Sequence, residues 1–116
     1  FVEKMQTIAT KFRQEQETGE ERGNLMRQYY DVYCLLGNQQ VQEFIGTAAY
    51  QTHKARRFPK KDLAIPIAKN EAYLLSNKLL RSRFKERYIA TASLYYKGQP
   101  DFEDVLQRIK EYIHTL

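Results

Sequence analysis

Apolar residues recur three and four positions apart along most of this chain, and no stretch alternates apolar and polar residues over the length of a strand. A spacing near 3.6 residues places apolar side chains on one face of a helix, where they can be buried together. The chain has 116 residues, which suits one compact domain with one core. We therefore predict an all-α fold, a single helical domain over residues 1–116 that forms an irregular bundle of about five to seven helices.

Glycine, proline and capping residues divide this pattern into segments. Asn24 precedes the second apolar stripe as an N-cap, and Gly37 ends that stripe. Asp101 opens the last segment, with a second aspartate three residues later that is close to a capping box. The apolar stripe drifts near Ser82, which predicts a kink or a break there. Helices are expected over residues 1–16, 25–36, 39–46, 48–57, 71–96 and 101–116, with an extended or loop segment between Pro59 and Pro66.

Cys34 is the single cysteine, so no disulfide can form within the chain. It lies in an apolar run, which favours a buried free thiol, and the cytoplasm is the expected compartment. No apolar stretch approaches the ~20 residues of a membrane span, so no membrane partner is expected. Two histidines and one cysteine argue against a dedicated zinc site.

Positive charge is concentrated in the middle of the chain. Residues 25–97 hold thirteen Lys or Arg and five Asp or Glu, a net charge of +8, whereas both ends are slightly acidic. A basic centre suits a phosphate-rich partner such as RNA, although a solvated surface can also be basic. Both interpretations stay open from charge alone.

Lys4 lies beside Glu3 at the boundary of the first apolar stripe. An ammonium there can contact a polyphosphate, or its stem can simply cover the edge of the core. Arg27 and Asp31 are four residues apart and share one helix face. They are either an exposed ion pair or groups that position a ribose, a metal or an attacking hydroxyl. The neighbouring Tyr30 can stack on a base or pack at the edge of the core.

Aromatic and cationic side chains are interleaved over residues 50–58, and the lysines at 60–61 extend the basic stretch. This mixture is typical of surfaces that contact single-stranded nucleic acid or its ends. His53, Lys54 and Arg57 are therefore candidate substrate-binding residues, although a lone histidine is more often a hydrogen-bonded structural residue.

Four segments, taken together, resemble a known family. Residues 1–8 carry a Glu-Lys pair on an amphipathic helix, and residues 27–33 read Arg-Gln-Tyr-Tyr-Asp-Val-Tyr. Downstream, His53 and Lys54 precede Phe58, and residues 95–102 combine aromatics with Gly, Pro and Phe before the last helix. In order and spacing these segments are similar to AbiEii/AbiGii-type nucleotidyltransferases, the toxins of type IV toxin–antitoxin and abortive-infection systems.

The resemblance implies the C-terminal helical part of a polymerase-β-like nucleotidyltransferase. Such enzymes transfer a nucleotide from a nucleoside triphosphate to an acceptor, and some relatives add nucleotides to the 3′ end of transfer RNA. In the family, a Gly-Ser motif and an Asp-x-Asp pair on an N-terminal sheet domain bind Mg²⁺ and the triphosphate, and this chain contains neither motif. Carried over, Lys4 would contact the triphosphate and Asp31 would be the essential carboxylate of the last motif.

The chain begins inside an amphipathic pattern at Phe1, so we expect its N-terminus to be an experimental boundary or a cleavage, and the fragment to be inactive alone. Gln28 replaces the usual histidine of the family, and Arg87 stands where an aspartate is common. A non-enzymatic helical module that binds nucleic acid or a protein partner is the main alternative, and a purely structural bundle is another. The enzyme hypothesis rests on one geometric expectation, that Lys4 and Asp31 approach each other across neighbouring helices and face an open cavity.

Overall fold

The computed structural model describes residues 1–95 and 97–116, and every regular element in them is a helix. The described residues form eight α-helices and two short 3₁₀ helices, so the all-α fold is confirmed and the expected number of helices is too low. Two of the eight, α5 (Lys60–Leu63) and α6 (Glu71–Leu74), have four residues each. An apolar period needs several turns to be recognised, so the sequence pattern does not reveal helices of one turn.

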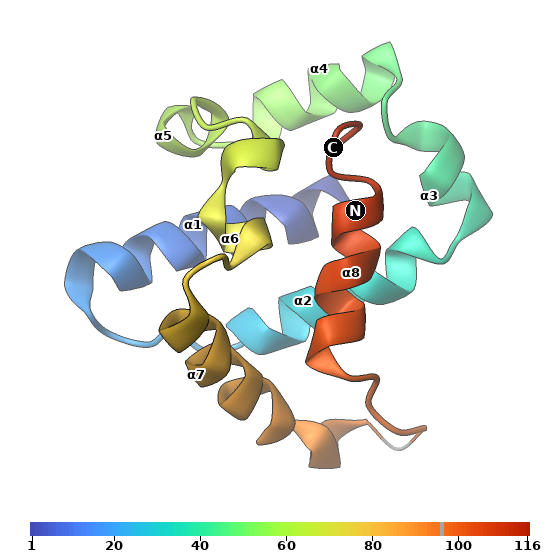
Figure 1. The fold of residues 1–116 in the computed structure, drawn as a ribbon. Coiled ribbons are helices and arrows are strands. Elements are labelled where there is room, and N and C mark those ends of the chain that lie inside the picture. Colours follow the sequence, from blue (N-terminus) through green and yellow to red (C-terminus); the bar gives the residue numbers. More distant parts are fainter. Residues whose placement is uncertain (96) are drawn as a thin grey trace.

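Figure 1 shows how these elements follow one another along the chain. The longest is α1 (Val2–Thr18), which ends where Gly19 adopts the left-handed conformation at φ 73°. None of the described helices is both long and apolar enough to cross a membrane. The others are α2 (Leu25–Leu36), α3 (Gln39–Phe44), α4 (Ala48–Arg57), α7 (Lys78–Ile89) and α8 (Phe102–Glu111), with 3₁₀ helices η1 (Ile67–Lys69) and η2 (Ala92–Leu94).

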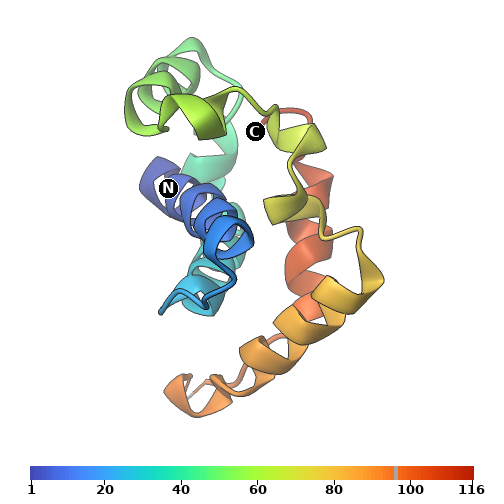
Figure 2. The ribbon, with the colours of Figure 1, turned by 90° about the vertical axis from the view of Figure 1, so that its left-hand side faces the viewer.

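The core lies between two groups of helices. α1 packs against α2, α4, α5 and α6, while α8 packs against α2, α6 and α7. Figure 2 shows α1 and α2 on one side of the molecule and α6, α7 and α8 on the other. Aromatic rings fill much of the space between them, because the largest fully buried side chains include Tyr29, Tyr50, Tyr88, Phe84 and Phe102.

Buried tyrosine hydroxyls join distant segments of the chain. Tyr29 donates to the carbonyl oxygen of Ala72 at 2.6 Å, and Tyr73 donates to that of Met5 at 2.5 Å. These bonds satisfy polar atoms inside an apolar core, where an unpaired hydroxyl would be costly. The hydroxyls of Tyr50 and Tyr88 donate in the same way to the carbonyls of Leu116 and Pro100, each at 2.8 Å.

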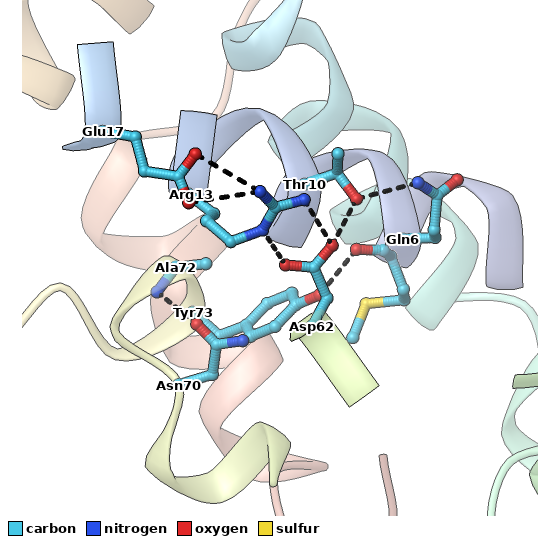
Figure 3. Close-up of polar contacts among 9 residues, drawn as sticks. Gln6, Thr10, Arg13, Glu17, Asp62, Asn70, Ala72 and Tyr73 are labelled. Atoms are coloured by element: carbon cyan, nitrogen blue, oxygen red, sulfur yellow. Dashed lines mark hydrogen bonds and ion pairs between the residues drawn. The ribbon is translucent and has the colours of Figure 1, made fainter. Parts of the chain in front are cut away.

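Asp62 is a carboxylate of α5 that is only 2% exposed, and its charge is paired. Its Oδ1 accepts from Arg13 Nε at 2.8 Å, and its Oδ2 accepts from the Thr10 hydroxyl at 2.7 Å. Figure 3 shows these side chains converging between α1 and α5. A buried carboxylate whose oxygens are hydrogen-bonded can hold a one-turn helix that has little apolar surface of its own.

Glu15 is a second buried carboxylate, near the end of α1. It accepts from Arg87 Nη1 at 2.8 Å and Nη2 at 2.9 Å, and from the backbone N–H of Arg22 at 2.7 Å. The pair is bidentate, the geometry that gives arginine its strongest carboxylate contacts. Arg87, which departs from the resembled family, therefore has a structural partner in this chain, and Glu15 ties both α7 and the α1–α2 loop to α1.

The expected long helix over residues 71–96 is wrong, because the chain breaks after α6. The break does not lie near Ser82, which is inside α7. It occurs where Leu75 adopts a left-handed conformation at φ 43° and Asn77 accepts a hydrogen bond from the backbone N–H three residues later. The asparagine side chain satisfies the first turn of α7, so a new helix starts there. Tyr96, the expected end of the long helix, lies outside the described residues.

Two caps and the cysteine also differ from expectation. Asn24 and Asp101 occupy the positions before α2 and α8, but neither side chain caps its helix. Asn24 has φ 64°, whereas an N-cap side chain reaches the first turn from an extended backbone. Cys34 is exposed rather than buried, because it lies on the face of α2 opposite the buried Val32 and Leu36.

Candidate functional site

Lys4 and Asp31 meet on the surface where α1 packs against α2. The Lys4 ammonium lies 3.0 Å from Asp31 Oδ2, and the two side chains are 40% and 21% exposed. The expected approach of these two groups across neighbouring helices is therefore confirmed. Both retain contact with solvent, so a ligand can reach either of them.

Arg27 joins this pair from one turn earlier in α2. Its Nε lies 4.0 Å from Asp31 Oδ2, and its side chain is 59% exposed. An ion pair this long and this exposed contributes little to stability, so the guanidinium can turn to another anion at small cost. We refer to Lys4, Arg27 and Asp31 as the Lys4 cluster.

Glu3 connects the Lys4 cluster to α4. Its Oε1 lies 3.3 Å from His53 Nε2 and 3.8 Å from Arg57 Nε. A hydrogen bond from its own backbone amide lowers the pKa of the Glu3 carboxyl, and the nearby His53 and Arg57 act in the same direction. The sequence pattern pointed to His53 and Arg57 but gave Glu3 no role of its own, because its partners come from a helix some fifty residues away.

Two other predicted site residues make mainly internal contacts. The Lys54 ammonium donates to the carbonyl of Leu116 at 3.0 Å, and burial lowers its pKa. Lys54 is thus not brought to the Lys4 cluster. Tyr30 precedes Asp31 on α2, but its ring stacks on Tyr95, with 4.1 Å between centroids. A hydrogen bond with Cys34 raises the pKa of the Tyr30 hydroxyl.

A run of exposed cations continues from Arg57 into α5. Arg56, Lys60 and Lys61 are exposed, and none has an ion-pair partner among residues 1–95 and 97–116. The only carboxylate in this stretch, that of Asp62, is buried against Arg13. We call Arg56, Arg57, Lys60 and Lys61 the α4–α5 basic surface. Arg57 lies 3.8 Å from the Glu3 carboxylate, but the other three cations have no such partner among the described residues, so the surface as a whole attracts a polyanion.

The cavity expected beside Lys4 and Asp31 is not among the main clefts. Neither Lys4 nor Asp31 lines any of the five main clefts in the described part of the chain, although Arg27 lines one of them. Within residues 1–95 and 97–116, no three His, Cys, Asp or Glu side chains lie together as a metal site requires.

Comparison with known proteins gives one match. The family model described as "Nucleotidyl transferase AbiEii toxin, Type IV TA system" matches residues 1–108. No curated protein and no solved structure matches this chain. The match spans α1 to most of α8 and includes every residue of the Lys4 cluster and of the α4–α5 basic surface.

Proposed function

Because the chain belongs to the family of AbiEii nucleotidyltransferase toxins of type IV toxin–antitoxin systems, we propose that it takes part in transferring a nucleotide from a nucleoside triphosphate to an RNA acceptor, such as transfer RNA, in the cytoplasm. The single observation that carries this proposal is the 3.0 Å contact between Lys4 and Asp31, with Arg27 beside it. It places a mobile ammonium, a carboxylate and a guanidinium on one open surface. Those are the groups that phosphoryl transfer uses to hold and orient its reactants.

The proposed role of Lys4 is to contact the triphosphate. Its side chain is 40% exposed, and its flexible stem allows the ammonium to leave Asp31 for a phosphate oxygen. Arg27 can follow, since its own contact with Asp31 is 4.0 Å long. Once the cations have turned to the phosphates, the Asp31 carboxylate is released to orient the attacking hydroxyl of the RNA and to accept its proton.

The proposed reaction uses Mg²⁺, but we do not assign its ligands to the residues described in this chain. In nucleotide transfer the metal neutralises charge on the phosphates and activates the attacking oxygen. Asp31 is the one carboxylate in the Lys4 cluster and is flanked by two cations, an arrangement that does not suit a divalent cation. We propose that the metal ligands lie on a separate polymerase-β-like domain, as the family resemblance implies.

The α4–α5 basic surface is the proposed contact for the RNA backbone. Arg57 belongs to this surface and lies 3.8 Å from Glu3, the neighbour of Lys4, so the surface continues to the Lys4 cluster. Arginine and lysine side chains without carboxylate partners release counterions when they bind phosphates, which favours RNA binding at low salt.

Replacing Lys4 with alanine in the full-length enzyme that we propose to contain this chain should lower kcat/KM for the triphosphate about tenfold. An interaction with the phosphates that exists in the ground state and in the transition state is lost, so most of the change should be in KM. Initial rates of labelled nucleotide incorporation into RNA, measured over a range of triphosphate concentrations, separate KM from kcat.

The matched control for Lys4 is Lys78→Ala, which removes an exposed lysine of α7 outside both proposed surfaces. Its kinetics should equal those of the unmodified enzyme. A Lys4→Ala enzyme with unchanged KM and kcat would remove Lys4 from the mechanism. The isolated chain should not incorporate nucleotide even with Mg²⁺ and RNA, and clear incorporation would contradict the proposed division between two domains.

A module that binds RNA without catalysis is the second candidate, and the unpaired cations of the α4–α5 basic surface favour it. The double variant Lys60→Glu/Lys61→Glu should weaken RNA binding by the isolated chain and reduce its salt dependence. Each phosphate contact to a single strand contributes about 0.7 to the slope of log K against log salt, so losing two contacts lowers the slope by about 1.4. Fluorescence anisotropy with a labelled RNA oligonucleotide at several salt concentrations measures this slope.

The variant Lys78→Glu/Lys85→Glu makes the same change in net charge on α7. It should alter the slope much less, because these lysines lie outside the basic surface. If both double variants weaken binding equally, RNA responds to overall charge and no local surface exists. A full-length enzyme whose nucleotide transfer is unchanged by substitution of both Lys4 and Asp31, but whose RNA binding is lost in Lys60→Glu/Lys61→Glu, would favour the non-catalytic module.

A further inference from the structure

A cleft of about 270 Å³ lies beside the Lys4 cluster, between the α1–α2 loop, the first turn of α2 and the end of α7. Leu25 and Met26, both buried, and the exposed Leu94 give it an apolar lining. Arg22 and Arg27 also line it. The volume is just below the usual range for drug-sized ligands, which suits one planar group of the size of a nucleobase. We refer to this space as the α2–α7 cleft.

The walls of the α2–α7 cleft are held in place by α1. Glu15 accepts hydrogen bonds from the backbone N–H of Arg22 at 2.7 Å and from both terminal nitrogens of Arg87, so one carboxylate fixes the loop wall and the α7 wall. The Lys11 ammonium donates to the carbonyl of Gly23 in the same loop. A cleft whose walls are already hydrogen-bonded loses little conformational entropy when a ligand enters.

Three arginines and one carboxylate, Glu21, line the α2–α7 cleft, so its net charge is positive. Arg87 lines the cleft, but its guanidinium is engaged by Glu15 and lies 3.7 Å from Glu21. Arg22 has no ion-pair partner among the residues that the structure describes, and Arg27 makes only the 4.0 Å contact with Asp31. An apolar slot with two available guanidinium groups favours a ligand that combines a flat ring with phosphate, which is the chemistry of a nucleotide.

We propose that the α2–α7 cleft binds the base of the incoming nucleoside triphosphate, an inference that rests on the proposed function. Arg27 provides the connection, because it lines the cleft and is also part of the Lys4 cluster. The base lies against Met26 and Leu94, and the phosphates extend past Arg27 toward Lys4. The side chains of the cleft, and Leu94 in particular, then decide which base fits.

The test is a titration of the ¹⁵N-labelled chain, followed by backbone amide shifts, with each of four nucleoside triphosphates and with inorganic tripolyphosphate. Concentrations up to about 10 mM detect the weak binding expected of one part of a two-part site. The triphosphates should shift amides of the cleft, such as those of Met26 and Leu94, as well as amides near Lys4. Tripolyphosphate, which has no base, should shift the amides near Lys4 and Arg27 and leave Leu94 unmoved.

Leu94→Glu should weaken binding of the triphosphates about tenfold and leave tripolyphosphate binding within about twofold, because it replaces apolar lining with a hydrated carboxylate at the place proposed for the base. Leu79→Glu is the matched control, since Leu79 on α7 is 64% exposed and Leu94 is 63% exposed, and Leu79 does not line the cleft. Both substitutions are at exposed positions, and dispersion of the amide spectrum shows that each variant is folded.

The outcomes separate this inference from the proposed function. If the triphosphates shift only the amides near Lys4, and Leu94→Glu does not change their affinity, the proposed base-binding role of the cleft is wrong. The proposed function then still stands. No shift with either triphosphate or tripolyphosphate contradicts both. Cleft shifts that appear with a short RNA oligonucleotide but not with triphosphates overturn the inference in favour of an acceptor-binding cleft.

Discussion

Replacing Asp31 with asparagine should lower the rate of nucleotide transfer by the full-length enzyme about 10²–10³-fold at saturating triphosphate. The amide keeps the shape of the carboxylate but cannot accept the proton of the attacking hydroxyl. Since Asp31 acts on the acceptor after the triphosphate is bound, the loss should be in kcat, with KM for the triphosphate changed little. Single-turnover incorporation of labelled nucleotide measures this step directly.

The fold should not account for that loss. Asp31 is 21% exposed and pairs with partly exposed cations, so its contribution to stability is at most about 1 kcal/mol. Asp104→Asn changes an exposed aspartate in the first turn of α8 in the same way and should leave transfer unaffected. A rate for Asp31→Asn within about threefold of the unmodified enzyme, with unfolding unchanged, would contradict the proposed role.

Replacing Asp62 with alanine should destabilise the isolated chain by about 3 kcal/mol. The substitution removes the carboxylate that accepts from Arg13 and Thr10, and it leaves a cation in a partly buried position with one partner, Glu17 at 3.3 Å. We place the loss at the lower end of the usual range for a broken buried pair, because the Arg13 side chain is 24% exposed and can turn to solvent. Urea denaturation followed by circular dichroism measures the change.

Two further variants test the cause of this destabilisation. Glu17→Ala removes the exposed partner of Arg13 and should change the free energy of unfolding by no more than about 0.5 kcal/mol. The double variant Arg13→Met/Asp62→Leu removes both charges and should recover much of the loss, because no unpaired charge is then buried. A double variant as unstable as Asp62→Ala would show that the shape of the network, rather than its charge balance, holds α5.

Much of the fold could be predicted because its longer helices carry apolar stripes. The expected helix over residues 48–57 coincides with α4, and the second expected helix coincides with α2. The one-turn helix α5 was missed, and α6 was predicted only as the start of a longer helix, since each is held by contacts from elsewhere in the chain. Asp62 and Arg13, for example, are separated by 49 residues, and no local sequence pattern predicts that they pair.

The candidate site could be predicted only in part. The contact between Lys4 and Asp31 was expected from the family resemblance and is confirmed, but neither residue lines any of the main clefts, although their neighbour Arg27 lines the α2–α7 cleft. Lys54 lies three residues before Arg57 on the same helix, so the sequence suggested that both belong to one surface. Its ammonium instead donates to the Leu116 carbonyl, because the end of the chain packs against α4. The residues around position 54 do not predict that packing. The catalytic and binding roles of all these residues stay predictions.

In the hydrogen bonds of the four buried tyrosines, the tyrosine and its partner residue differ in how freely each can be substituted. Each hydroxyl donates to a main-chain carbonyl, and every amino acid supplies such a carbonyl. Substituting Ala72 or Pro100 can therefore preserve the bond as long as the backbone stays in place, whereas substituting Tyr29 or Tyr88 always removes it. The hydrogen bond therefore constrains side-chain identity at the tyrosine and not at its partner, where only packing limits which residue fits.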